Sequence, residues 1–142
     1  MRIVERNIKM QKVLTVGVYD YFHLGHLRLF ENAKKYGDYL TVAVQDESYI
    51  LKTKPEANIL YTTEQRCDLV RALKVVDEVV IYEDVDRLLP TVEFDVFAVG
   101  EDQTHEGFQR AIEWCKEHEK SVVRMKRTPG ICSSNIKNEL KK

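Results

Sequence analysis

The sequence predicts an α/β protein with a Rossmann-like open parallel sheet of about five strands and helices on both faces. Short apolar runs rich in β-branched residues alternate along the chain with segments whose apolar residues recur at helical spacing. The apolar runs are nearly continuous, as expected for parallel strands that are buried on both faces. Polar residues suited to chemistry follow several of these runs, and open parallel sheets place their sites beyond the carboxyl ends of the strands.

In the first half of the chain, apolar runs define strands and amphipathic spacing defines helices. The elements expected there are a strand over 13–18, a helix over 24–36, a strand over 39–44, a polar connection over 46–61 and a helix from residue 62. Gly37 suits the C′ position after the first helix. Thr62 and Gln65 have the spacing of a capping box, which predicts that the second helix starts there.

The same signals continue through the second half of the chain. The elements expected there are a strand over 77–82, a short helix within 84–92, a strand over 94–99, a helix that includes 108–115, a strand over 121–125 and a closing helix over 133–140. Gly100 ends the fourth strand. Phe108, Ala111 and Cys115 have helix-face spacing, which places them on the buried side of one helix.

Length and composition indicate one cytoplasmic domain. The chain has 142 residues, which suits a single core. We expect residues 1–11 to be an N-terminal extension and 12–142 to form one domain. The N-terminus lacks the apolar core of a signal peptide, and no apolar run approaches the roughly 20 residues that span a bilayer. Cys67, Cys115 and Cys132 have no CxxC spacing and are interpreted as free thiols in a reducing compartment.

Charge gives no support for a nucleic-acid binder. Lys and Arg together number 22 and Asp and Glu 23, for a formal net charge of −1. Nucleic-acid binders usually carry a basic excess or stripe. We therefore expect no nucleic-acid partner and no membrane partner.

The first strand is followed by His23-Leu24-Gly25-His26, which also opens a helix. A helix N-terminus presents unpaired N–H groups and a positive dipole end to an anion, and two imidazoles add two donors. Gly17 can adopt a backbone conformation barred to other residues, and Gly25 allows close approach of a ligand. This combination predicts a polyphosphate site. The turn is not GxGxxG, which disfavours a dinucleotide-binding oxidoreductase. His105 and His118 have no such pattern and are interpreted as surface or packed residues without a catalytic role.

A second anion-binding motif joins the last strand to the closing helix. It reads Arg127-Thr128-Pro129-Gly130-Ile131-Cys132-Ser133-Ser134. A guanidinium beside a glycine turn and a hydroxylated helix start would face the first motif. Ser133 and Ser134 also suit an ordinary N-cap, and Asp102 after the fourth strand also suits a helix cap. Lys52 and Lys54 would equally suit a solvated connection. Arg66 shares a helix face with aliphatic residues, so its head group needs a partner or must reach outward.

Together these motifs resemble the cytidylyltransferase family of the HxGH nucleotidyltransferase superfamily, and especially the glycerol-3-phosphate cytidylyltransferases. The resemblance extends from about residue 12 to residue 140. It includes Glu64-Gln65-Arg66 and the segments 17–20, 37–40, 76–79 and 95–97. HxGH alone would also admit adenylyltransferases, and the second motif favours the cytidylyl branch. Cys132 stands where the family usually has serine.

The resemblance implies roles for individual residues. His23, His26, Lys52 and Arg127 would be catalytic. The nucleotide would contact Gly17, Val18, Tyr19, Asp20, His23, Gly25, His26, Asp102, Arg127, Thr128, Cys132 and Ser133. The acceptor phosphate would contact Lys52, Lys54, Arg66, Arg127 and Thr128. Asp20 would also support the first turn.

The implied reaction couples CTP to a small phosphomonoester, for which sn-glycerol 3-phosphate is the leading candidate, giving CDP-glycerol and pyrophosphate. Mg²⁺ would accompany CTP, and no protein metal site is expected. The resemblance also implies a homodimer and, by analogy, a place in cell-surface polysaccharide biosynthesis. Alternatives are ATP in place of CTP, another acceptor such as phosphoethanolamine, phosphocholine or a sugar phosphate, or a nucleotide-binding regulator without turnover.

Overall fold

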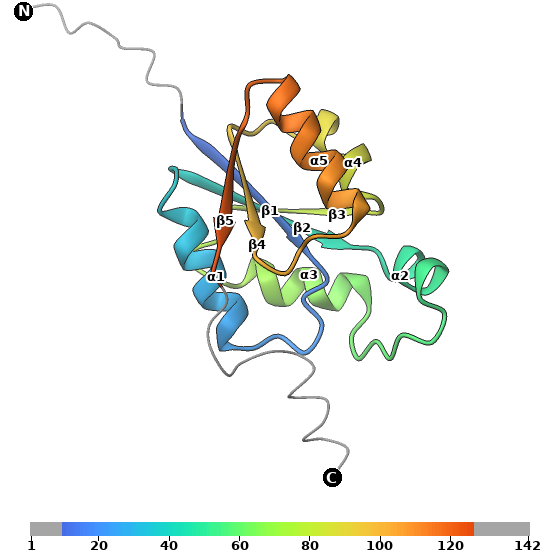
Figure 1. The fold of residues 1–142 in the computed structure, drawn as a ribbon. Helices are drawn as coiled ribbons and strands as arrows, with labels where there is room; N and C mark the ends of the chain where they lie inside the picture. Colours follow the sequence, from blue (N-terminus) through green and yellow to red (C-terminus); the bar gives the residue numbers. More distant parts are fainter. Residues whose placement is uncertain (1–9, 127–142) are drawn as a thin grey trace, which may run out of the picture.

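A computed structural model describes residues 10–126 and contains a five-stranded parallel sheet of order β3-β2-β1-β4-β5 (Figure 1). The strands are β1 (Lys12–Gly17), β2 (Tyr39–Gln45), β3 (Glu78–Tyr82), β4 (Val96–Gly100) and β5 (Ser121–Met125). The helices are α1 (Leu24–Lys34), α2 (Glu47–Thr53), α3 (Thr63–Arg71), α4 (Val85–Leu88), the 3₁₀ turn η1 (Leu89–Thr91) and α5 (Glu106–Glu117). The predicted fold class is confirmed.

Two hydrophobic cores lie on opposite faces of the sheet. One contains Val13 of β1 with residues of α1 and α3, and the other contains Leu14 of β1 with residues of α4 and α5. Figure 1 shows the same division, with α1 and α3 on one side of the sheet and α4 and α5 on the other. Consecutive residues of β1 thus enter opposite cores, as the two-residue period of a strand requires. Burial on both faces explains the continuous apolar runs.

Two of the three cysteines lie in these cores. Cys67 and Cys115 are buried free thiols, as predicted, and Cys132 lies outside the described residues. Burial raises the pKa of Cys115 to about 11. Neither of these two buried side chains has the exposure of a reactive thiol. Within residues 10–126, no helix has both the length and the apolar character that crossing a bilayer requires.

Two local expectations are wrong. The connection over 46–61 contains α2, whose N-cap is Asp46, because the Asp46 carboxylate accepts a hydrogen bond from the Ser48 N–H at 3.3 Å. Gly37 is not the C′ residue of α1, which ends at Lys34 with Lys35 as C-cap. A Cβ at Gly37 would lie 2.5 Å from the Gln11 carbonyl oxygen, so this glycine permits close backbone contact. The capping box of Thr62 and Gln65 is confirmed. The closing helix over 133–140 lies outside the described residues.

Three aspartates, at the amino ends of β2, β3 and β4, each close a reciprocal pair of hydrogen bonds to the neighbouring strand. The N–H of Asp77 donates to the Leu40 carbonyl at 3.0 Å, and the Leu40 N–H donates to the Asp77 carboxylate at 2.8 Å. Asp38 makes the same pair with Gln11, and Asp95 makes it with Lys12. Each carboxylate therefore satisfies an N–H that the sheet ladder leaves without a partner.

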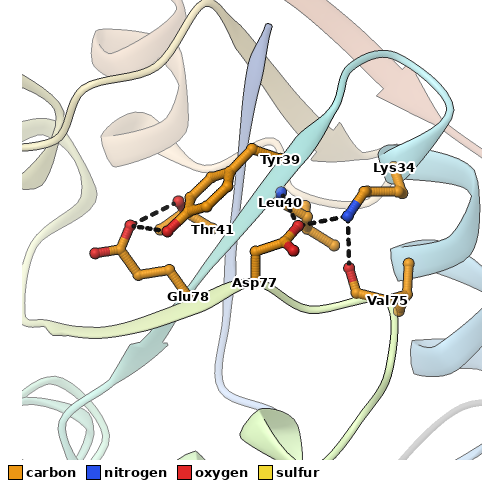
Figure 2. Close-up of polar contacts among 7 residues, drawn as sticks. All are labelled: Lys34, Tyr39, Leu40, Thr41, Val75, Asp77 and Glu78. Carbon is orange, nitrogen blue, oxygen red and sulfur yellow. Dashed lines mark hydrogen bonds and ion pairs between the residues drawn. The ribbon is translucent and has the colours of Figure 1, made fainter. Parts of the chain in front are cut away.

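Asp77 also binds Lys34, which ties α1 to the sheet (Figure 2). The Lys34 ammonium additionally donates to the Val75 carbonyl at 3.4 Å. Burial acts to raise the pKa of Asp77, but the hydrogen bonds from Lys34 and from the Leu40 N–H lower it below its usual value. Beside it, Glu78 accepts hydrogen bonds from the Tyr39 and Thr41 hydroxyls at 3.4 and 3.2 Å (Figure 2).

We expect Asp77→Leu to lower the free energy of unfolding by about 1–3 kcal/mol at pH 7, because it removes charge-assisted hydrogen bonds from a half-buried N–H and an ammonium. Asp77→Asn keeps an acceptor for Leu40 and should lose less. Since the pKa is lowered on folding, this contribution is present above the unfolded pKa and is lost as the pH falls below it. Urea denaturation at pH 7 and pH 3 measures both effects.

The matched control is Asp68→Leu, because Asp68 forms only an exposed i,i+3 pair with Arg71. It should change stability by less than about 0.5 kcal/mol. Equal losses at positions 68 and 77 would contradict the role given to Asp77.

Candidate functional site

A cavity of about 980 Å³ opens at the carboxyl edge of the sheet. Its walls come from the β1–α1 turn, the start of α1, α2 with the segment after it, the β3–α4 turn and the β4–α5 turn. Of the predicted site residues, those lining it are Gly17, Val18, Tyr19, Asp20, His23, Gly25, His26, Lys54 and Asp102. The structure thus brings together segments that are far apart in the sequence.

His23 and His26 cap the start of α1. The Gly25 N–H donates to Nδ1 of His23 at 3.0 Å, and the His23 N–H donates to Nδ1 of His26 at 3.2 Å. The two rings stack with centroids 3.9 Å apart and planes inclined by 22°. Because each Nδ1 accepts a hydrogen bond, either ring in its neutral form carries its proton on Nε2. The pair therefore caps the helix with one nitrogen of each ring.

The ring of His26 is held by aromatic neighbours. Tyr19 meets it edge-on at 5.4 Å and Phe22 packs beside it at 5.1 Å. Burial, followed by the neighbouring His23, lowers the pKa of His26 to about 3. His26 is therefore neutral near pH 7, in the state that donates from Nε2.

Glycine is needed at position 17 for a different reason from the one predicted. The left-handed residues in this turn are Tyr19 at φ 58° and Tyr21 at φ 51°. The Tyr19 conformation turns its ring back over Gly17, where a Cβ would lie 2.7 Å from that ring. Gly17 thus makes space for the aromatic side chain that packs against His26.

Asp20 and Arg66 fasten the β1–α1 turn to the start of α3. The Asp20 carboxylate, 6% exposed, accepts hydrogen bonds from the Leu60 and Tyr61 N–H groups at 2.6 and 3.0 Å. This agrees with its expected role in supporting the turn. Arg66 is completely buried, and burial lowers its pKa, although the negative charge of Asp20 opposes that shift.

Arg66 corrects the prediction of a direct contact with the acceptor. Its guanidinium donates to the carbonyls of Val18, Gln45 and Tyr61 at 2.9, 2.7 and 3.2 Å, and to the Thr63 hydroxyl at 3.2 Å. It has no exposed surface and does not line the cavity. The guanidinium is therefore a positioning group that joins the β1–α1 turn, the end of β2 and the segment before α3.

The two predicted lysines have different positions. Lys52 lies in the last turn of α2, exposed and outside the cavity lining, whereas Lys54 directly follows α2 and lines the cavity. α2 is anchored at its start, because the Thr63 hydroxyl accepts from the Glu47 N–H at 2.8 Å and donates to Asp46 at 3.1 Å. The helix that precedes Lys54 is thus anchored at its N-terminal end.

Several cavity residues were missed by sequence reasoning. Lys126 follows β5 and adds a cation to the lining, and its place at a carboxyl strand end was a usable signal. Gln103 lines the cavity beside Asp102 and bridges β1 and β4. His105, interpreted as a surface or packed residue, is exposed but also borders the cavity.

The second predicted anion motif lies outside the described residues, and with it Arg127, Thr128, Cys132 and Ser133. Within residues 10–126, no group of three or more His, Cys, Asp or Glu side chains is arranged to hold a metal ion.

Comparison with known proteins identifies the family. The sequence model described as cytidylyltransferase-like matches residues 14–139. The chain is 32% identical over 134 residues to the glycerol-3-phosphate cytidylyltransferase of Bacillus subtilis, a match that covers 92% of this chain and 98% of that protein. It is 37% identical over 135 residues to a FAD synthase of Ferroglobus placidus, covering 88% of this chain and 84% of that protein.

A solved structure has the same fold. The lipopolysaccharide core biosynthesis protein from Thermoplasma volcanium matches with a TM-score of 0.72 at 27% identity, covering 84% of this chain and 98% of that one. The resemblance seen in the sequence is confirmed. The chain belongs to the cytidylyltransferase-like family and is a nucleotidyltransferase.

Proposed function

We propose that this nucleotidyltransferase transfers the cytidylyl group of CTP to sn-glycerol 3-phosphate, releasing pyrophosphate. The observation that carries the proposal is that the two capping histidines at the start of α1 and Lys54 after α2 line the same cavity. Hydrogen-bond donors at a helix N-terminus suit a polyphosphate, and a lysine in the same cavity suits a second phosphate. The match to a glycerol-3-phosphate cytidylyltransferase over nearly the whole chain supports this choice of substrates.

The chemistry needs alignment and charge stabilisation rather than a base. A phosphomonoester is largely ionised near pH 7, since its second pKa is about 6. One of its oxygens attacks the α-phosphorus, a new P–O bond forms, and the bond to the bridging oxygen breaks as pyrophosphate leaves. Hydrogen bonds from His23 and His26 would stabilise charge that builds up on the phosphates. Lys54 would offset repulsion between the two anions.

Two further cations would take part. Lys52 and Arg127 would add positive charge for the acceptor and the α-phosphate, and the connection over 46–61 would close over the substrates beyond its anchored start. Mg²⁺ would arrive with the nucleotide, bound chiefly by its phosphates. A homodimer remains a prediction from the family resemblance.

A second candidate is adenylyl transfer to a flavin phosphate. It is favoured by the 37% identity to a FAD synthase, since FAD is FMN joined to AMP. The phosphate-binding groups would act in the same way in both reactions, because CTP and ATP carry the same triphosphate. The two candidates therefore differ in base and acceptor, and a direct assay separates them.

We expect pyrophosphate release with Mg²⁺, CTP and sn-glycerol 3-phosphate that exceeds release with ATP and FMN by at least about 100-fold in kcat/KM, or 2.7 kcal/mol in transition-state stabilisation. A coupled pyrophosphate assay measures both pairs and the two crossed pairs. The nucleotide product is identified by mass spectrometry.

Preference for ATP with FMN would replace the first candidate with the second. Nucleotide binding without pyrophosphate release from any tested phosphomonoester would instead favour a non-catalytic regulator.

We expect His26→Asn to lower kcat by about 10²–10³, the loss typical of one transition-state hydrogen-bond donor. Asparagine can place an acceptor near the position of Nδ1 and so keep the bond from the His23 N–H, but it has no donor at the Nε2 position. Steady-state kinetics with the preferred substrate pair measures the effect. Near-normal turnover would remove His26 from the catalytic residues.

The pH dependence of stability checks that His26 is neutral in the fold. Its folded pKa of about 3 lies below the unfolded value of about 6.5. The unfolded chain therefore binds the extra proton, and stability is lost as the pH falls from 6.5 toward 3. Between pH 7 and pH 5 this loss should be about 1–2 kcal/mol in the wild type and absent at this position in His26→Asn.

We expect substitution of Arg66 to act mainly on the stability of the fold. Arg66→Lys should lower the free energy of unfolding by about 3–5 kcal/mol, because an ammonium cannot reach the four acceptors that a buried guanidinium satisfies. Arg71→Lys on the same helix, where the side chain is exposed, is the control. Urea denaturation and acceptor KM are measured together. A large rise in acceptor KM with unchanged stability would restore the direct contact with the acceptor.

A further inference from the structure

β1 and β4 separate before either strand ends. Their pairing covers Val13–Thr15 of β1 and Val96–Ala98 of β4. On their other sides, β1 pairs with β2 as far as Gly17, and β4 pairs with β5 as far as Gly100. The strand order also reverses between β1 and β4, and open parallel sheets bind ligands at such a crevice. The last backbone groups facing this gap therefore have no ladder partner.

Gln103 fills that gap with its side-chain amide. Its Nε2 donates to the Val16 carbonyl at 2.9 Å, and its Oε1 accepts from the Gly100 N–H at 2.8 Å. The amide has one donor and one acceptor in the roles of a peptide group, so it acts as an extra rung between the separated strands. Val16, Gly100 and Gln103 all line the cavity.

The turn that carries Gln103 is also braced by β5. Arg124 donates to the Gln103 carbonyl at 3.0 Å, and the Glu101 N–H donates to the Met125 carbonyl at 3.0 Å. A Cβ at Gly100 would lie 3.1 Å from the Asp102 carboxylate and 3.4 Å from the Gln103 amide oxygen. The turn is thus held on one side by the bonds of Gln103 to β1 and β4 and on the other by its bonds to β5. Asp102 lies between Glu101 and Gln103, the two residues that make these bonds.

We propose that Gln103 is a positioning residue for the nucleotide, because its amide sets the spacing between the histidine turn after β1 and the Asp102 turn after β4. The inference rests on the proposed nucleotide site in this cavity. A nucleotide that reaches both turns needs them at one fixed separation, and a shift of about 1 Å at a distant support can reduce activity about 100-fold. Gln103 makes no contact with the reacting phosphates in this role.

The variants are Gln103→Met, which removes both hydrogen bonds at similar length, and Gln103→Glu, which keeps only the acceptor. Gln109→Met is the matched control, because Gln109 bonds the Thr104 carbonyl at 2.9 Å without reaching β1. Calorimetry measures binding of CTP and of ATP, each with Mg²⁺, and steady-state assays measure KM for both substrates. Hydrogen exchange at Gly100 and thermal unfolding report on the bridge and on the fold.

We expect Gln103→Met to weaken binding of the preferred nucleotide about 10-fold or more while acceptor KM changes less than about 2-fold. Gly100 should exchange faster, and Gln109→Met should resemble the wild type. In Gln103→Glu, the carboxylate repels the Val16 carbonyl at pH 8, and protonation at lower pH restores a donor. Its nucleotide affinity relative to the wild type should therefore improve as the pH falls.

Nucleotide affinity within 2-fold of the wild type in both variants, with faster exchange at Gly100, would overturn the inference. Equal losses for nucleotide and acceptor, in step with the melting temperature, would also overturn it, since they indicate general structural damage. Failure of the wild type to bind either CTP or ATP would overturn the proposed function, and this inference with it.

Discussion

The burial of one guanidinium constrains the whole carboxyl edge of the sheet. Arg66 has no exposed surface, and a buried charge is costly unless it is surrounded by hydrogen-bond partners. Its partners are carbonyls from the β1–α1 turn, the end of β2 and the segment before α3. Asp20 lies close enough to oppose the effect of burial on Arg66, and it binds the same segment through two N–H groups. The histidine turn and the base of α2 are therefore fixed relative to each other before any ligand arrives.

The two ends of the sheet satisfy their backbone groups with different chemistry. At the amino ends, Asp38, Asp77 and Asp95 accept backbone N–H groups with carboxylates. At the start of α1 an imidazole takes the place that aspartate or serine often occupies. A carboxylate at that position would repel a polyphosphate, whereas a neutral imidazole accepts with Nδ1 and donates with Nε2. Helix capping and anion binding are thus compatible at one pair of side chains.

The sequence was informative where one signal was strong and local. Continuous apolar runs predicted all five strands, and HxGH after the first strand predicted the position of the histidine pair. It was less informative where the role of a residue depends on contacts with groups that are distant in the sequence. The helix-face position of Arg66 indicated only that its head group needs a partner, and the family resemblance implied the acceptor. Its partners proved to be a neighbouring hydroxyl and carbonyls up to 48 positions away. Gly17 and Gly37 are required by a tyrosine ring and by a neighbouring carbonyl, neither of which is visible in local spacing.

Substrate choice depends on two kinds of group in the cavity. In the proposed reaction, the imidazoles, the helix N-terminus and Lys54 bind phosphate, a feature shared by every candidate nucleotide and acceptor. Such groups are compatible with relatives that are named for different products, a glycerol-3-phosphate cytidylyltransferase and a FAD synthase. Discrimination must come from groups that meet the base or the organic part of the acceptor. Tyr49 and Asp84 also line the cavity, and a phenol with a carboxylate makes a wall that differs chemically from the histidine turn. Because the phosphate-binding groups serve all candidates, loss of turnover on mutating them reports the reaction class, and only competition between substrates reports the specificity.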